Sequence, residues 1–229
     1  MLIFSQRSGR SSRGRACRPA GFTLIELMVV VSIMVLVTAL ILIRQSRFDS
    51  STLLRSLAYS VALSVRQAQI YGSSVLGTST LQANCVGNFN LSLGACYANA
   101  YGIDINLSTP GNYVLFADLN NDGKYEAGES IKTFTLNNGY SILDICATAG
   151  GGTVYCKADG LTQLDIVFRR PNPEACFSSV LQSGVCAPGA TQYYSQAVLK
   201  LVNSADTTNT RSVTVTQTGE VQVCALVGC

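Results

Sequence analysis

An acidic segment in the middle of the chain has the residue types and spacing of a calcium-binding loop. The pattern D-x-[DN]-x-[DN]-G-x5-E begins at Asp118 and ends at Glu129. Calcium prefers oxygen ligands, and this spacing offers the side chains of Asp118, Asn120, Asp122 and Glu129 together with the carbonyl oxygen of Lys124. The flanking residues have the pattern of strands rather than of EF-hand helices, so a polar hairpin turn is the competing interpretation. Calcium is the one cofactor that the sequence suggests.

Little else in the chain could support catalysis. The sequence contains no histidine, which excludes a Ser-His-Asp or Cys-His arrangement. The acidic residues outside the segment 118–129 are mostly isolated, and the glycines at 150–152 precede a strand pattern instead of the helix that a phosphate-binding loop requires. We therefore predict that the protein is not an enzyme.

Glu26 is the charged residue with the most unusual surroundings. It lies in a run from Phe22 to Ile43 that is otherwise apolar, apart from a few small hydroxyl side chains. A run of this length is long enough to cross a bilayer as one helix. A carboxylate among acyl chains is costly unless it is paired, so Glu26 is predicted to have a function and a partner.

The residues before the apolar run are basic. Residues 1–21 contain five arginines and no acidic residue, so this end of the chain is expected to stay in the cytoplasm while everything after Arg44 is translocated. The apolar run is longer than that of a secretory signal peptide, and the glycine that could mark cleavage, Gly21, lies before the run instead of after it. Cleavage there would remove the leader and leave the membrane helix on the mature protein.

The sequence Gly-Phe-Thr-Leu-Ile-Glu at residues 21–26, followed by the apolar run, resembles the class III signal of type IV pilins and type II secretion pseudopilins. The resemblance implies that a prepilin peptidase cuts after Gly21 and N-methylates Phe22. It also implies that Glu26 pairs with the N-terminal amine of a neighbouring subunit. The expected partners are therefore the peptidase, other pilin or pseudopilin subunits and the inner membrane. The alternative is a simple signal anchor that happens to contain a glutamate.

The charge of the chain depends on its leader. Removal of the five leader arginines leaves 11 basic against 13 acidic residues. The adjacent pair Arg169-Arg170 is expected to be a solvated strand end, and residues 197–229 have no excess of positive charge. Because neutralisation of phosphates dominates affinity for DNA, we expect no nucleic-acid partner.

Eight of the nine cysteines lie in the part expected to be translocated, where the compartment is oxidising. An even number of cysteines there indicates disulfides, and the absence of histidine and of any CxxC pair argues against zinc. The short separations between successive members favour four local pairs: Cys85–Cys96, Cys146–Cys156, Cys176–Cys186 and Cys224–Cys229.

The pattern after the membrane run predicts one helix followed by strands. Apolar residues recur at three- and four-residue steps from Leu54 to Ala68, and no glycine or proline interrupts the segment before Gly72. Nine strand-like segments follow: Tyr101–Leu107, Tyr113–Leu119, Ser130–Leu136, Ser141–Ile145, Thr153–Lys157, Gln163–Phe168, Ala197–Val202, Arg211–Gln217 and Glu220–Val223.

The expected fold class is α+β, a pilin-like fold with one long N-terminal helix packed on an antiparallel β-sheet and with disulfide-rich loops. The expected parts are a removable leader (1–21), a transmembrane half-helix (22–43), an amphipathic half-helix (44–72) and a β domain (73–229). The last two strands form a hairpin pattern similar to that of GspH/FimT-type minor pilins and pseudopilins.

The resemblance implies a structural subunit of a fibre. We expect a minor pilin of a type IV pilus, which helps to prime or cap the fibre and resides in the inner membrane with its C-terminal domain in the periplasm before assembly. A minor pseudopilin of a type II secretion system is the alternative. A DNA-binding minor pilin of an uptake system is a third possibility that the charge does not favour.

Overall fold

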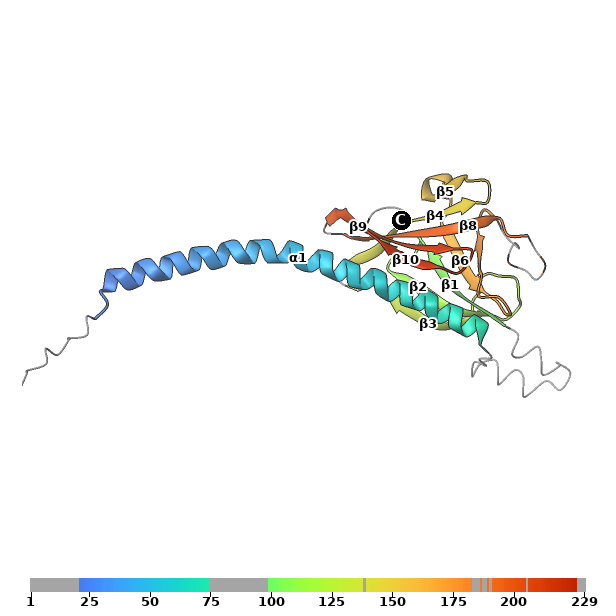
Figure 1. The fold of residues 1–229 in the computed structure, drawn as a ribbon, viewed down its shortest axis with the longest axis horizontal. Helices are drawn as coiled ribbons and strands as arrows, with labels where there is room; N and C mark the ends of the chain where they lie inside the picture. The colour runs from blue at the N-terminus through green and yellow to red at the C-terminus, as the bar shows by residue number, and fades with distance from the viewer. Residues whose placement is uncertain are drawn as a thin grey trace, which may run out of the picture. The chain divides into compact units, whose positions relative to one another are not determined.

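The computed structural model describes residues 21–74, 99–137, 139–182, 186, 189, 191–204 and 206–225 (Figure 1). For residues 43–50 it describes the backbone alone. The chain divides into two compact units, Met1–Ser46 and Arg47–Cys229, and each is considered by itself.

One long α-helix, α1, runs from Leu24 to Ser73. At its start the hydroxyl oxygen of Thr23 accepts the backbone N–H of Glu26 at 3.3 Å, as expected of a residue that caps a helix N-terminus. Near its end Gly72 lies against the backbone carbonyl of Phe168, where a Cβ atom would overlap with it. The helix ends at Ser73, one residue beyond the predicted limit at residue 72.

The two halves of α1 have different surroundings. Among the described residues, Leu24–Leu42 is the one helical stretch long and apolar enough to cross a membrane, and its side chains are exposed in the isolated chain. In the second half, a stripe at helical spacing is buried, with Leu54, Val61 and Val65 at 1% exposure or less. This stripe belongs to the same hydrophobic core as residues of the strands, as the periodicity predicts.

The first sheet has five strands in the order β3-β2-β1-β6-β7, and all neighbours are antiparallel. In chain order these strands are β1 (Ala100–Asn106), β2 (Asn112–Asp118), β3 (Ser130–Thr135), β6 (Gln163–Phe168) and β7 (Ala175–Ser179).

The second sheet also has five antiparallel strands, in the order β10-β9-β8-β4-β5. They are β4 (Tyr140–Ala149), β5 (Val154–Cys156), β8 (Tyr194–Asn203), β9 (Asp206–Thr216) and β10 (Val221–Cys224); a short 3-10 helix, η2 (Lys157–Asp159), follows β5.

The predicted α+β class is confirmed, with two differences in detail. The strands form two sheets where one was expected, because alternating patterns show which residues face a core but not which strands pair. Strand β7 was not predicted, since its sequence Ala-Cys-Phe-Ser-Ser follows two prolines and contains few strand-forming residues. Among the described strands it is an edge strand, and it pairs with β6 alone.

The terminal hairpin is present and packs against α1. Strands β9 and β10 pair in antiparallel register from Val221↔Val215 to Cys224↔Ser212. Gly219 in the turn has a φ of +82°, and a Cβ atom there would overlap with Gln69 of the helix and with the carbonyl of Pro173. Glycine is therefore required both by the backbone conformation and by the close approach.

Candidate functional site

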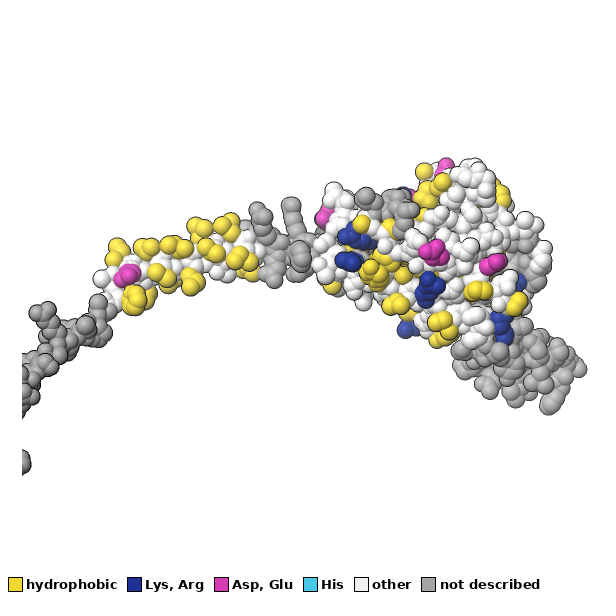
Figure 2. Space-filling view, viewed as in Figure 1, with side chains coloured by type: hydrophobic (Ala, Val, Ile, Leu, Met, Phe, Trp, Pro, Cys, Tyr) yellow, Lys and Arg dark blue, Asp and Glu magenta, His cyan; other side chains and the backbone are white. Residues whose placement is uncertain are grey.

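Glu26 is the only charged residue in the apolar stretch Leu24–Leu42. Figure 2 shows one acidic side chain among the hydrophobic side chains along this part of the helix. Within the described part of the chain, the Glu26 carboxylate has no hydrogen-bond or ion-pair partner. Its partner must therefore come from outside this stretch of the subunit if the helix lies in a membrane.

The predicted cleavage point lies just before α1. Gly21 and Phe22 precede the first helical residue, Leu24, and both are exposed. No other atom approaches within 4 Å of the position of a Cβ on Gly21. The peptide bond between Gly21 and Phe22 is therefore accessible and is not part of a helix.

Among the described residues, two of the four predicted disulfides are present, Cys146–Cys156 and Cys176–Cys186. The first joins the directly paired strands β4 and β5. Cys224 is also disulfide-bonded. Its predicted partner Cys229, and the predicted pair Cys85–Cys96, lie outside the described residues.

The acidic segment 118–129 connects β2 with β3, and Asp118 is its most buried carboxylate. Asp118 has no exposed surface, and its two oxygens accept the backbone N–H groups of Asp122 at 3.1 Å and Gly123 at 3.0 Å. The guanidinium of Arg169 lies 3.3 Å from the same carboxylate. Burial raises the pKa of Asp118, while the Gly123 N–H and Arg169 act in the opposite direction.

Glu129 closes the segment with hydrogen bonds to the backbone. One of its carboxylate oxygens accepts the N–H of Leu119 at 2.8 Å, and the other accepts the N–H of Glu126 at 2.9 Å. Burial raises the pKa of Glu129. Both oxygens that would form a bidentate calcium contact are thus used within the loop.

Asn120 and Asp122 also accept backbone N–H groups of the loop, those of Asp122 at 3.1 Å and of Lys124 at 2.9 Å. Among the described residues, the one group of three acidic or cysteine side chains with ligand atoms mutually within 4.8 Å is Asp144, Cys146 and Cys156. That group contains a disulfide and does not belong to the loop. The observed geometry is that of a self-supporting hairpin connection, and calcium binding stays a prediction.

Arg169 has a different role from the one expected. The sequence suggested a solvated strand end, but Arg169 pairs with a fully buried carboxylate and also donates to the carbonyl of Asn121. Its partner lies 51 residues earlier in the chain. Asp118 is formally the first ligand position of the calcium pattern, so the guanidinium supplies a positive charge where the pattern predicts a metal.

The structure also contains a buried pair of acidic residues that the sequence analysis did not predict. Asp104 on β1 and Asp165 on β6 are direct cross-strand partners, and both are at most 5% exposed. Gln163 donates to Asp104 at 2.9 Å, and the backbone N–H of Tyr125 donates to Asp165 at 3.3 Å. The available signal was an aspartate inside each of two apolar strand patterns, Gly-Ile-Asp-Ile and Gln-Leu-Asp-Ile-Val.

Comparison with known proteins supports the interpretation of the N-terminal segment. Residues 17–42 match the family model described as the prokaryotic N-terminal methylation motif. Comparisons with curated proteins and with solved structures find no match.

The match identifies the class III signal of type IV pilins at the start of this chain. Together with the apolar helix, it supports a membrane-anchored protein that is similar to type IV pilins and pseudopilins at its N-terminus. The motif implies processing by prepilin peptidase and assembly with other pilins. The matched range includes the predicted processing positions Gly21 and Phe22 as well as Glu26.

Proposed function

We propose that this protein is a minor pilin of a type IV pilus, of the GspH/FimT type, that helps to prime or cap the fibre. The observation that carries the proposal is the class III signal joined to an exposed apolar helix with a single carboxylate. In this proposal the peptidase cuts after Gly21, and the new amine of Phe22 on one subunit pairs with Glu26 on its neighbour. One cleavage thus creates the partner that the intramembrane carboxylate requires.

The second half of α1 supports assembly through the same helix. Tyr59, Leu63 and Ile70 lie on the face opposite the buried stripe, and Leu63 is 67% exposed. Their spacing of four and seven residues places them on one side of the helix. Burial of such side chains against another subunit stabilises by about 1.5–3 kcal/mol for each fully covered one, so this face is suited to helix packing in a fibre.

The features of the β domain support the minor pilin more than the DNA-binding alternative. The sequence pattern of the terminal hairpin of β9 and β10 is similar to that of the GspH/FimT type, and disulfides are suited to a domain exposed outside the cell. The mature chain has no net positive charge to attract DNA. A minor pseudopilin of a type II secretion system shares the signal and the helix and is the second candidate.

Substitution of Glu26→Leu tests the proposal, with Met28→Leu as a control for a neutral change in the same helix. The Glu26→Leu variant should be cleaved and should remain in the membrane fraction, yet be absent from sheared fibres. The control should enter the fibres normally. Normal incorporation of Glu26→Leu refutes the pairing. Deletion of the gene in its host separates the two machines: loss of pili supports the minor pilin, and loss of protein secretion with intact pili supports the pseudopilin.

A further inference from the structure

We propose that a pocket between α1 and the terminal hairpin binds a carboxylate side chain presented by a neighbouring subunit, and that Arg55 and Arg211 are its ligands. This inference rests on the proposed function, since it assumes that the protein assembles with other pilin-like subunits. It adds a specific polar contact, in the β domain, to the assembly contacts of the membrane helix.

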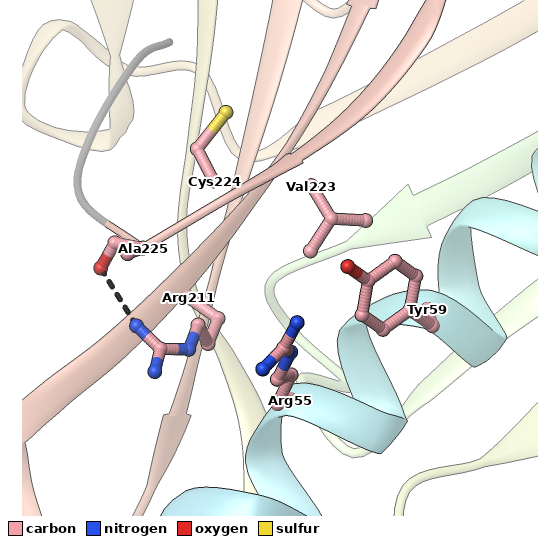
Figure 3. Close-up of a pocket in the computed structure, with 6 residues that line it drawn as sticks. All are labelled: Arg55, Tyr59, Arg211, Val223, Cys224 and Ala225. Carbon is pink, nitrogen blue, oxygen red and sulfur yellow. Dashed lines mark hydrogen bonds between the residues drawn. The ribbon is translucent and has the colours of Figure 1, made fainter.

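The pocket has a volume of about 270 Å³ and lies within the second compact unit. It is lined by Arg55, Tyr59, Arg211, Val223, Cys224 and Ala225. Figure 3 shows the Arg55 side chain pointing away from the helix and the Arg211 side chain turned toward the carbonyl of Ala225. Two elements that are distant in the sequence therefore supply one cation each.

Neither guanidinium has an acidic partner among the residues that the structure describes. Arg211 donates one N–H to the carbonyl of Ala225 at 3.1 Å, and the guanidinium of Arg55 lies 5.8 Å from the centre of the Tyr59 ring. The ion pairs among the described residues involve other side chains. Each guanidinium thus keeps several N–H donors for a further acceptor, and an anion between the two would relieve the repulsion of like charges.

The chemistry of the walls favours a carboxylate from a protein. A guanidinium matches the planar carboxylate with two parallel hydrogen bonds. The remaining walls are an aromatic ring and the apolar side chain of Val223, and Arg and Tyr are the residue types that dominate the centres of protein interfaces. A nucleic-acid backbone would instead need a row of cations, which the nearly neutral hairpin does not provide.

The surface beside the pocket continues the face already proposed for assembly. Tyr59 lines the pocket, and Leu63 and Ile70 follow it along the exposed side of the same helix. Hydrophobic and basic side chains lie together over this part of the molecule in Figure 2. A neighbouring subunit that covered the apolar side chains would thus bring an acidic residue within reach of the two arginines.

The first test titrates the full-length protein in detergent micelles with sodium glutarate, against sodium chloride at equal ionic strength. Glutarate carries the carboxylate of an acidic side chain. The side-chain N–H signals of Arg55 and Arg211 in nuclear magnetic resonance spectra should shift with glutarate in the wild type. Glutarate should also raise the melting temperature of the wild type. The double variant Arg55→Gln/Arg211→Gln should show no such rise, whereas Lys132→Gln, which removes a cation from β3, should show the same rise as the wild type. Equal responses of all three proteins overturn the proposal.

The second test measures the content of each variant in sheared fibres. The double variant should be cleaved and membrane-bound as the wild type is, but its incorporation should fall by about tenfold, the effect of losing a central interface contact. Lys132→Gln should be incorporated normally. If Glu26→Leu is excluded from fibres while the double variant enters them, the pocket proposal fails and the proposed function stands. If Glu26→Leu also enters normally, the proposed function itself fails.

Two further outcomes would identify another occupant and overturn the proposal. Tighter binding of inorganic phosphate than of glutarate, with unchanged fibre content of the double variant, would indicate a phosphate-bearing ligand. A response to glutarate only in a chain that ends at Ala225, with Cys224→Ser, would indicate that the residues after Ala225 occupy the pocket of the full chain.

Discussion

Asp104 and Asp165 lie directly opposite each other on the paired strands β1 and β6, and both carboxyl groups are buried. Burial, followed by the charge of Asp104, raises the pKa of Asp165 to about 9. Burial also raises the pKa of Asp104. At neutral pH the pair therefore holds a proton, and its oxygen atoms anchor the segment 118–129 through the N–H of Tyr125. The positive charge of Lys124 acts in the opposite direction and lowers the pKa of Asp165.

The buried pair predicts a stability that declines with rising pH. The folded pKa of Asp165 is raised above its ordinary value of 3.8, so the folded state keeps a proton that the unfolded state releases. This contribution is fully present below pH 3.8 and is lost as the pH rises towards 9. The slope is at most about 1.4 kcal/mol per pH unit. The chain has no histidine, but burial also raises the pKa values of Asp118 and Glu129, which act in the same direction, so a variant is needed to isolate the share of Asp165.

Asp165→Asn checks this dependence, since asparagine keeps the size of the side chain and a donor for Asp104. The free energy of unfolding of the full-length protein, measured with denaturant from pH 5 to pH 9, should fall more steeply for the wild type than for the variant. Equal slopes would show that the pair is not protonated at neutral pH.

The ion pair of Arg169 with Asp118 predicts a large effect on stability. Arg169→Met leaves the fully buried carboxylate of Asp118 without its cation, which should lower the free energy of unfolding by about 2–4 kcal/mol. The double variant Arg169→Met/Asp118→Asn removes both charges and should recover part of the loss. If Arg169→Met is as stable as the wild type, the two backbone N–H groups that donate to Asp118 are sufficient to stabilise its carboxylate.

Calcium binding at the segment 118–129 has a test that uses the same arginine. Calcium at this segment would compete with Arg169 for Asp118 and with two backbone N–H groups for Glu129. Millimolar calcium should therefore raise the melting temperature of Arg169→Gln more than that of the wild type, and Asp122→Ala should abolish the rise. The absence of a shift in both Arg169→Gln and the wild type leaves the hairpin turn as the explanation of the motif.

Removal of a disulfide should lower the free energy of unfolding of the protein. Cys146–Cys156 closes a loop with a sequence separation of 10 residues, and the double variant Cys146→Ser/Cys156→Ser should lose about 2–3 kcal/mol. Denaturant unfolding of the oxidised proteins gives this difference. Mass spectrometry of unreduced peptides tests the pairs Cys85–Cys96 and Cys224–Cys229, and a cross-link between these two pairs would contradict the local arrangement.

The parts of this structure that the sequence predicts are those set by local patterns. The spacing of Leu54, Val61 and Val65 predicts the buried face of α1, and Gly219 between two alternating segments predicts the terminal hairpin. The order of residues at the N-terminus predicts the signal that the family model matches. Each of these depends on residues that are close together in the chain.

The remaining features depend on contacts between distant residues. Nothing near Asp104 in the sequence shows that Asp165 lies opposite it, because strand order and register decide that pairing. Likewise, the partner of Arg169 is known only once β6 is placed beside β1 and β1 beside β2. The two arginines line one pocket because β9, which carries Arg211, is brought near the helix residue Arg55 by the fold.

The contact between Gly219 and Gln69 joins residues separated by 150 positions. Synthesis runs from the N-terminus, so Gln69 of the helix is made long before Gly219 of the hairpin that packs against it. The part of the core that the helix shares with β9 can therefore form only after these late residues are present. Until then the apolar stripe of the helix lacks this cover, and a chain truncated before β9 would leave it exposed.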